Sequence, residues 1–255
     1  MSQKSIRINN NNNNNSSSNW NSASFRIFFE GWLVRQEHYL DELISAKSNI
    51  YEKNENDLKD LIERVLSHYQ QYYEAKSLLA KEDVYILFSP IWFSSFELAF
   101  LWIAGFKPGL AIRIVLNSVD DLSEEQLQRM ERLRLEIRVE ENELEGDMAR
   151  VQESLAEPPL SEMARRSGRK LVEVERRSQM MVDESSSKEE AIEMLKSSMK
   201  ILVERADFLR LKITMKVVEI LNPVQTVKLL VAAAQIQLRI RKWGFQRDAE
   251  RRRNR

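Results

Sequence analysis

The chain has 255 residues, of which 43% are hydrophobic and 31% charged, and its formal net charge is zero. A neutral chain has no overall field that would draw it onto nucleic acid or an acidic membrane. The absence of cysteine excludes disulfides, thiol nucleophiles and cysteine-bound zinc, and six glycines and five prolines are too few for the frequent turns of a sheet or barrel. We therefore expect an all-α fold, a multi-helix bundle of long amphipathic helices.

The N-terminal segment is of low complexity, with an unbroken run of asparagines at 9–15 and serines at 16–18. Such a segment cannot bury enough apolar area to offset the entropy lost on ordering, so we predict a disordered Asn/Ser-rich tail over 1–22. It also lacks the apolar stretch of a secretory signal. One helical domain is expected over 23–250, with a basic C-terminal tail over 247–255.

Two amphipathic helices are expected first, one starting near Phe25 and one over 56–79, because apolar residues in both recur every three or four positions. Residues 84–106 are the only candidate membrane span. Ser89-Pro90 interrupts this stretch and Ser94 with Glu97 matches a capping box, so we predict instead a buried core helix of about ten residues. The residues expected to form the structural core here are Trp92, Phe96, Phe100, Trp102, Gly105 and Pro108.

Helix signals continue through the next part of the chain. Pro108 can open a short helix over 110–116, and Ser123 with Gln126 caps the longest helix, which Pro158-Pro159 ends. The apolar seam of that helix steps by threes and fours but is interrupted at 140–141. A more polar helix is expected over 160–182, followed by a turn at 185–187.

Ser187 and Glu190 are expected to cap the next helix, whose apolar a/d pattern runs over 192–220. Asn222-Pro223 then starts the last helix, with Gln225 at its third position. We interpret the apolar seams as contacts between neighbouring helices of one chain. An intermolecular coiled coil through 123–156, and with it a homodimer, stays open as the alternative.

The sequence offers no catalytic constellation. The two histidines, His38 and His68, stand beside Glu37 and Tyr69, but neighbours in a helix point to different faces. No common metal-binding, nucleophile or phosphate-binding motif occurs. We therefore expect no enzyme, no metal site and no membrane partner.

Binding signals concentrate in the last helix. Ile236-Gln237 followed by Arg241 matches the first half of a calmodulin-binding IQ pattern, although Lys242 replaces the usual glycine and Arg247 comes one place late. The end of the helix is basic, which fits a nuclear-import signal or a phosphate-contacting tail, and equally a solvated helix end. The basic residues are Arg239, Arg241, Lys242, Arg247, Arg251, Arg252, Arg253 and Arg255.

The chain resembles the plant Delay of Germination family. The resemblance rests on FFEGWLVRQEHYLDEL at 28–43, WFSSFELAFLWIAGFKP at 92–108, the NPVQ at 222–225 and KWGFQRDAERRRNR at 242–255. The same domain forms the C-terminal half of TGA-class bZIP transcription factors. The resemblance extends over residues 25–250, and its most specific part is the tryptophan-rich stretch at 92–108.

The resemblance implies a non-enzymatic regulator of seed dormancy, germination or transcription, located in the nucleus and in some cases also in the cytoplasm. Members of the family are similar in binding regulatory proteins: phosphatases of abscisic-acid signalling, bZIP factors and, for some, calmodulin. DNA association, through bZIP partners or the basic tail, is the alternative. Sequence-specific DNA contact of the bZIP kind is not expected, because no basic helix with heptads precedes the domain in this sequence. The residues expected to contact partners, besides the basic tail, are Trp32, Arg35, Gln36, Ile236, Gln237, Arg241, Lys242 and Trp243.

Some members of the family are also similar to haem proteins, with histidines shortly before the Trp-Gly of the last helix. Gln237 and Arg241 stand at those positions here, and neither side chain is a usual axial ligand. We therefore expect no haem and no other cofactor.

Overall fold

The computed structural model describes residues 21–49, 54–158, 160–162, 165 and 181–254, and for 181–188 the backbone alone. No strand occurs in these residues, where the only β-type pairing joins Trp102 to Gly105. The all-α prediction is confirmed. The longer helices are α1 (Ser22–Ser48), α2 (Glu55–Glu82), α4 (Leu110–Ser118), α5 (Glu124–Glu153), α7 (Met181–Ile220) and α8 (Pro223–Arg253).

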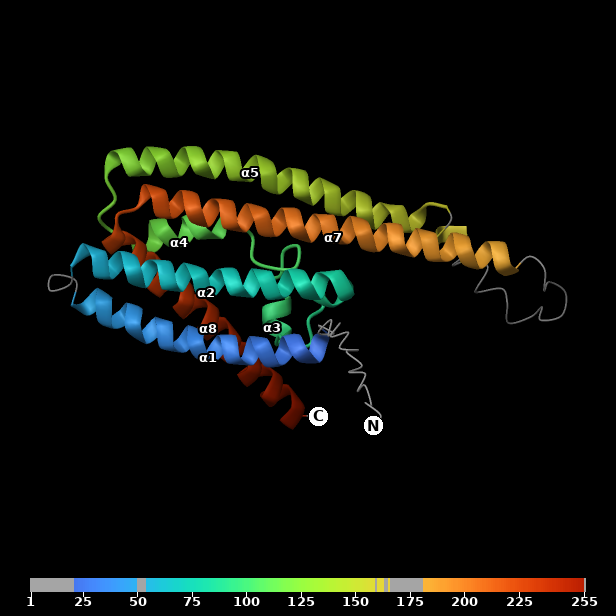
Figure 1. Cartoon of the computed structure of the whole chain (residues 1–255), viewed down its shortest axis with the longest axis horizontal. Coiled ribbons are helices and arrows are strands. Elements are labelled where there is room, and N and C mark those ends of the chain that lie inside the picture. Colours follow the sequence, from blue (N-terminus) through green and yellow to red (C-terminus); the bar gives the residue numbers. More distant parts are fainter. Residues whose placement is uncertain (1–20, 50–53, 159, 163–164, 166–180, 255) are drawn as a thin grey trace, which may run out of the picture.

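The helices form two side-by-side pairs, α1 with α2 and α5 with α7, and α8 crosses the bundle obliquely (Figure 1). Because α8 contacts α1, α2 and α4, it holds the two halves of the bundle together. One end of the α5–α7 pair extends beyond the other helices. Of the tail predicted over 1–22, residues 1–20 lie outside the described residues, and the side chain of Asn21 caps α1.

The buried apolar residues gather in clusters that each join several helices. One cluster joins α4, α5 and α7 through residues such as Ile112, Ile137 and Ile213. A second is aromatic and lies around the start of α1, and a third joins α1, α2 and α8. The seams of α5 and α7 meet in the first cluster, so the interpretation of these seams as contacts within one chain is confirmed.

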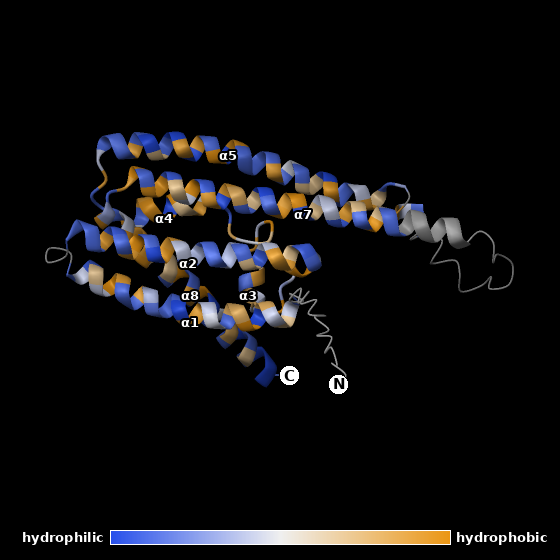
Figure 2. Cartoon of the chain, in the orientation of Figure 1, coloured by the Kyte–Doolittle hydropathy of each residue, from blue (hydrophilic) through white to orange (hydrophobic). Residues whose placement is uncertain are grey.

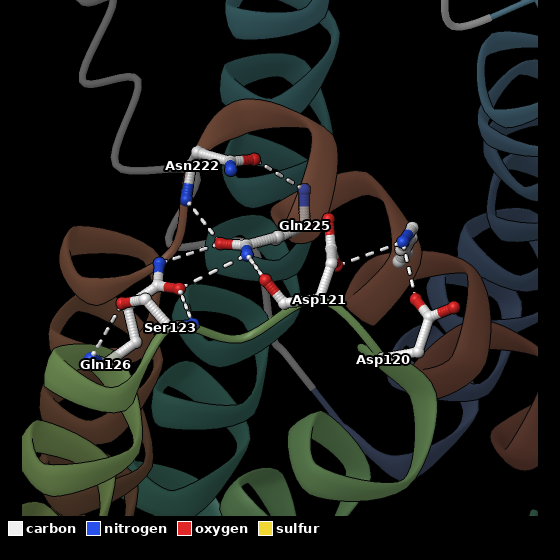
Figure 3. Close-up of polar contacts among 7 residues, drawn as sticks. Asp120, Asp121, Ser123, Gln126, Asn222 and Gln225 are labelled. Atoms are coloured by element: carbon white, nitrogen blue, oxygen red, sulfur yellow. Dashed lines mark hydrogen bonds and ion pairs between the residues drawn. The ribbon is translucent and has the colours of Figure 1, made fainter.

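The N-termini of α5 and α8 lie next to each other and are joined by hydrogen bonds (Figure 3). Each carries a complete capping box, Ser123 with Gln126 and Asn222 with Gln225, as the sequence predicts. The two glutamines also bond one another, with Gln126 Nε2 donating to Gln225 Oε1 at 2.8 Å. Gln225 Nε2 in turn donates to the backbone carbonyl of Asp121 at 2.9 Å. The two caps therefore fix the relative position of two helices as well as their ends.

Glu141, a polar residue that interrupts the apolar seam of α5, is buried and caps another helix. Glu141 is 5% exposed, and its Oε1 accepts the N–H of Gly109 at 2.6 Å. Gly109 is the N-cap residue of α4, where backbone N–H groups lack helical partners and a carboxylate is favoured. The polar position at Glu141 thus supports the packing of α4 on α5.

The prediction of a buried helix within 84–106 is wrong. The segment contains a 3-10 turn, η1 (Tyr85–Leu87), and a single helical turn, α3 (Ser95–Leu98), and is otherwise non-helical. The predicted Ser94–Glu97 capping box is present, but Ile103 and Ala104 have φ angles of 42° and 57°, which a right-handed helix does not contain. A buried arginine of α7, described below, satisfies the carbonyls that a helix would have bonded internally.

The turn predicted at 185–187 and the cap at Ser187 are also wrong, because α7 is continuous from Met181. Serine in a helix interior costs only about 0.5 kcal/mol relative to alanine, so three serines do not by themselves end a helix. A second 3-10 turn, η2 (Ser154–Ala156), follows α5 ahead of Pro158-Pro159. Most of the helix expected over 160–182 lies outside the described residues.

Candidate interaction surfaces

A buried arginine of α7 organises the loop that follows α3. Arg210 is 1% exposed, and its guanidinium donates to the backbone carbonyls of Trp102 (2.5 Å), Ile103 (2.9 Å) and Phe106 (2.7 Å). An ideal Cβ on Gly105 would lie 2.6 Å from Arg210 Cζ, so only glycine lets the loop close around the cation. The irregular loop therefore packs closely around the charged guanidinium group of Arg210.

The charge of Arg210 is balanced by Asp207, which also bonds a buried lysine of α2. Arg210 Nη1 lies 2.5 Å and Lys76 Nζ 2.8 Å from Asp207 Oδ1. Burial lowers the pKa of Lys76 to about 8, and the nearby Asp207 opposes this shift. One carboxylate thus links α2, α7 and the loop in the interior of the bundle.

A second arginine, Arg241 of α8, holds the tryptophan-rich segment against the last helix. Its Nη1 donates to Glu97 Oε1 and to the carbonyl of Trp92, both at 3.1 Å. The guanidinium also lies over two aromatic rings, 5.2 Å from the centroid of Phe29 and 4.7 Å from that of Phe245. Arg241 is therefore an internal clamp, with a side chain that is only 17% exposed.

The backbone of α8 comes closest to this segment at Gly244. An ideal Cβ there would lie 2.0 Å from Ser94 Oγ and 2.7 Å from Ser94 Cβ. One turn further on, Asp248 Oδ2 accepts the N–H of Ser95 at 3.0 Å, and its other oxygen accepts the Ser95 hydroxyl. The specific residues at 92–97 therefore serve to dock the C-terminal part of α8 on the bundle.

Two of the residues predicted to contact partners on α1 are buried. Trp32 is 2% exposed, and its Nε1 donates to the carbonyl of His68 at 2.9 Å. Gln36 is 1% exposed and donates to Tyr69 Oη at 2.7 Å and to Gln237 Oε1 at 3.2 Å. The expectation that Trp32 and Gln36 offer an exposed contact surface is wrong, because α2 and α8 cover that face of α1. Arg35 does lie on the exposed surface.

Three of the predicted contact residues of α8 lie together on its exposed side. Ile236 is 38% and Trp243 56% exposed, and Lys242 lies on the surface with them. The basic tail continues as an exposed helix that carries Arg247, Arg251, Arg252 and Arg253, whereas Arg255 lies outside the described residues. We call the residues Lys242, Trp243, Arg247, Arg251, Arg252 and Arg253 the basic end of α8. Gln237 and Arg241 belong to the opposite, docked side.

The predicted core residues of the tryptophan-rich segment have different environments. Trp92 is 5% exposed, and Trp102 is half-buried with its Nε1 donating to Glu145 at 2.9 Å. Phe100 is 62% exposed and packs with the half-buried Phe96, their ring centroids 5.0 Å apart, so its assignment to the core is wrong. Its outward position follows from the early end of α3, which turns the chain before a buried helical face can form. Phe245 of α8, which is 42% exposed, is a further exposed aromatic residue, and the sequence pattern did not single it out.

The buried histidine, His68, stacks on Trp32 with ring centroids 4.4 Å apart. Its two ring nitrogens have no hydrogen-bond partner among the described residues. Burial, with a smaller contribution from Arg35, lowers the pKa of His68 from 6.5 to about 4. The ring is therefore neutral at physiological pH and suited to packing.

Because the pKa of His68 is lowered in the folded state, the stability of the fold should decrease at acidic pH. Well above pH 6.5 the ring is neutral in both the folded and the unfolded state. As the pH falls from 6.5 towards 4, the unfolded state takes up a proton that the folded state does not, so stability is lost. At pH 5 the loss due to His68 should be about 2 kcal/mol relative to pH 7.

Urea unfolding at the two pH values would measure this loss. The His68→Phe variant keeps a flat ring against Trp32 and should lack this part of the loss, while the same change at the exposed His38 should leave the loss intact. Equal pH dependence in wild type and His68→Phe would contradict the assignment.

Other kinds of site are not seen in the part of the chain that the structure describes. No group of three or more His, Asp or Glu side chains gathers there as a metal site requires. None of the described helices combines the length and the apolar composition needed to cross a membrane.

Comparisons with known proteins agree with the segments quoted above. A family model described as seed dormancy control matches residues 39–117. The chain is 39% identical over 238 residues to Protein RESPONSE TO ABA AND SALT 1 of Arabidopsis thaliana, covering 91% of this chain and 97% of that protein. It is 38% identical over 227 residues to Protein ZW2 of the same plant, covering 88% of this chain and 97% of that protein.

Transcription factors are also similar to part of the chain. Transcription factor TGA7 of Arabidopsis thaliana is 34% identical over 140 residues, which cover 54% of this chain and 37% of that protein. None of these relatives carries the name of an enzyme.

Proposed function

This chain belongs to the seed dormancy control family, and from that premise we propose that it is a non-enzymatic regulator that acts by binding other regulatory proteins in the nucleus. One relative is named for its response to ABA and salt, and we extend a role in abscisic-acid signalling to this chain. The proposed partners are phosphatases of that pathway and bZIP factors. The similarity to TGA factors favours the bZIP partners.

The basic end of α8 is the surface that carries this proposal. It combines an exposed tryptophan with several arginines on a helix whose other side is fixed to the bundle by Arg241 and Asp248. Exposed tryptophan and arginine side chains are among the residues that most often dominate the energy of a protein interface. The charge of this surface suits an acidic partner.

The way α8 packs on the bundle also weighs against the calmodulin and haem alternatives. A calmodulin target helix must offer its apolar side to a groove, but that side of α8 contacts α1 and α3, so calmodulin would have to detach the helix. Gln237 bonds Gln36 and Arg241 bonds Glu97, so both positions that could concern haem have structural partners. We therefore propose that neither haem nor calmodulin is needed for the partner binding of the folded chain.

A charge-reversal experiment tests the proposed surface. The variant Arg251→Glu/Arg253→Glu should recover about tenfold less of its regulatory partners from plant extract than wild type does, measured by quantitative mass spectrometry. The matched control is Arg132→Glu/Arg138→Glu, which makes the same change in charge at exposed positions of α5. Equal loss of partners in both variants, or in neither, would refute a role for the basic end.

Direct nucleic-acid binding is the competing outcome. It predicts that wild type shifts a short DNA duplex of arbitrary sequence, with an affinity that falls steeply as salt rises. Loss of DNA binding in Arg251→Glu/Arg253→Glu, with protein partners retained, would favour that function over the one proposed.

A further inference from the structure

An open groove of about 410 Å³ lies on the surface of the bundle between α4 and the middle of α8. Its apolar lining comes from Leu110 and Ile114 of α4 and from Ala232 and Ile236 of α8. Leu110 and Ile236 are 41% and 38% exposed, so they form the rim of the groove rather than a buried floor. We call this feature the α4–α8 groove.

The polar lining of the groove carries a free positive charge. It consists of Arg113, Asn117 and Ser118 of α4, and the Ser118 hydroxyl is already bonded to the carbonyl of Ile114. Arg113 is exposed and has no ion-pair or hydrogen-bond partner among the residues that the structure describes. Its guanidinium group is therefore available to an acidic group that enters the groove.

The side of α8 that lines the groove continues towards the basic end of the helix. Ile236, Arg239, Trp243 and Arg247 follow one another at intervals of three or four residues, so they lie along one side of α8. Arg239 and Arg247 are exposed, and neither forms an ion pair within the described part of the chain. Figure 2 shows α8 changing from partly apolar to hydrophilic at its C-terminal end. The groove is thus continuous with the basic end of α8.

Neither wall of the groove contains an acidic residue. α4 has none, and α8 has none from Leu229 to Arg247. Asp120 and Asp121, which follow α4 in the chain, are already bonded to Lys228 at 2.7 and 3.0 Å. An apolar groove whose exposed charges are all positive is complementary to an acidic partner.

An amphipathic helix with acidic residues beside its apolar face fits this surface. Such helices bind by placing apolar side chains at i, i+3 or i+4, and i+7 into a groove. α4 has nine residues and is therefore about 13 Å long, which matches two to three turns of a partner helix. Carboxylates that flank the apolar face would then meet Arg113 and Arg239.

Two other occupants match the groove less well. A second copy of this chain, bound through the same surface, would bring the same positive charges to face themselves. The phosphate backbone of a nucleic acid would meet the cations but would leave the apolar lining of the groove exposed.

We propose that the α4–α8 groove binds an acidic amphipathic helix of a partner protein, with its apolar side chains between Leu110 and Ile236 and its carboxylates on Arg113 and Arg239. The proposal rests on the proposed function, because it states which kind of segment a regulatory partner presents to this chain.

Fluorescence anisotropy with the full chain and a labelled model peptide tests the groove. The peptide is a helix of about fourteen residues with leucines on one face and glutamates on both sides of that face. Wild type should bind it saturably. Leu110→Ser/Ile236→Ser and Arg113→Glu/Arg239→Glu should each bind it about tenfold more weakly.

Matched control variants lie at exposed positions of α5. Leu135→Ser/Val139→Ser makes the same apolar change and Arg132→Glu/Arg138→Glu the same change in charge, and both should bind the peptide as wild type does. Circular dichroism should show the same helix content in all variants, because every replaced side chain is exposed. No saturable binding by wild type, or equal binding by the groove variants and the controls, would overturn the proposal.

Changing the peptide tests the chemistry of the occupant. A peptide with lysine in place of each glutamate should bind wild type at least about tenfold more weakly, and should bind Arg113→Glu/Arg239→Glu better than wild type. A peptide with serine in place of each leucine keeps the acidic charge but should lose binding. If this polar peptide or a short DNA duplex bound as tightly as the leucine peptide, charge alone would explain binding and the proposed helix would be refuted.

The groove and the proposed function can fail separately. If wild type bound the peptide through the groove but recovered no regulatory protein from plant extract, the groove would stand and the proposed function would fall. If wild type recovered such partners but did not bind the acidic peptide, the proposed function would stand and the groove would be refuted.

Discussion

Replacing Arg210 with methionine should lower the free energy of unfolding by about 3–5 kcal/mol. The change removes the donor to the carbonyls of Ile103 and Phe106 and one of the two donors to that of Trp102, and none of these carbonyls has a helical partner because the loop is not a helix. A buried acceptor left without a donor costs about 1–3 kcal/mol, and Asp207 also loses one of its two cations. Urea unfolding at neutral pH, followed by circular dichroism, measures the loss.

The comparison with Lys76→Met separates this loop-specific effect from the general effect of removing a buried cation. Lys76 and Arg210 are both 1% exposed, and both bond Asp207, but Lys76 has no bond to the loop. Burial disfavours the charge of Lys76, as its lowered pKa shows, so its replacement by an apolar side chain recovers part of that cost. Lys76→Met should therefore be more stable than Arg210→Met by at least about 2 kcal/mol. Equal stabilities of the two variants would show that Arg210 does not support the loop.

The same network explains why the sequence predicted the long helices correctly and the segment 84–106 wrongly. The long helices are specified locally, by an apolar period and by caps such as Ser123 with Gln126, so a short window contains the information. The loop after α3 is specified by Arg210, which lies more than a hundred residues further along the chain. No local pattern reveals that this arginine will be buried.

The candidate surfaces were likewise predicted only in part from the sequence. The basic end of α8 was visible as a cluster of charges, but the pattern did not show that Gln237 and Arg241 face inwards, because that depends on Gln36 and Glu97 of other elements. The a/d pattern predicted over 192–220 describes only the buried face of α7, and the exposed apolar residues of that helix were given no role. Only the exposed fractions of residues such as Phe208 separate the two faces.

The Gly244→Ala variant should be less stable than wild type by about 2 kcal/mol, although alanine is the better helix former. The added methyl group would lie 2.0 Å from Ser94 Oγ, and Ser94 is fully enclosed and bonded within its capping box, so it has little room to move. The segment 92–97 and α8 must separate, which weakens the bonds from Arg241 to Glu97 and from Ser95 to Asp248. Amide exchange over 241–253 should accelerate together with the loss of stability.

Two controls isolate the close approach at Gly244 from the intrinsic effect of the substitution. Gly146 lies in the interior of α5, and a Cβ there would meet nothing nearer than Arg150 Nη1 at 3.7 Å, so Gly146→Ala should gain about 0.5–1 kcal/mol. Ser94→Gly removes the two atoms that would lie within 3 Å, at the cost of its cap, and in that background Gly244→Ala should cost clearly less stability, because only Phe96 Cβ at 3.2 Å stays close. If Gly244→Ala were as stable as Gly146→Ala, the docking of α8 on the tryptophan-rich segment would not limit stability. If the two changes at 94 and 244 were simply additive, these residues would not be in direct contact.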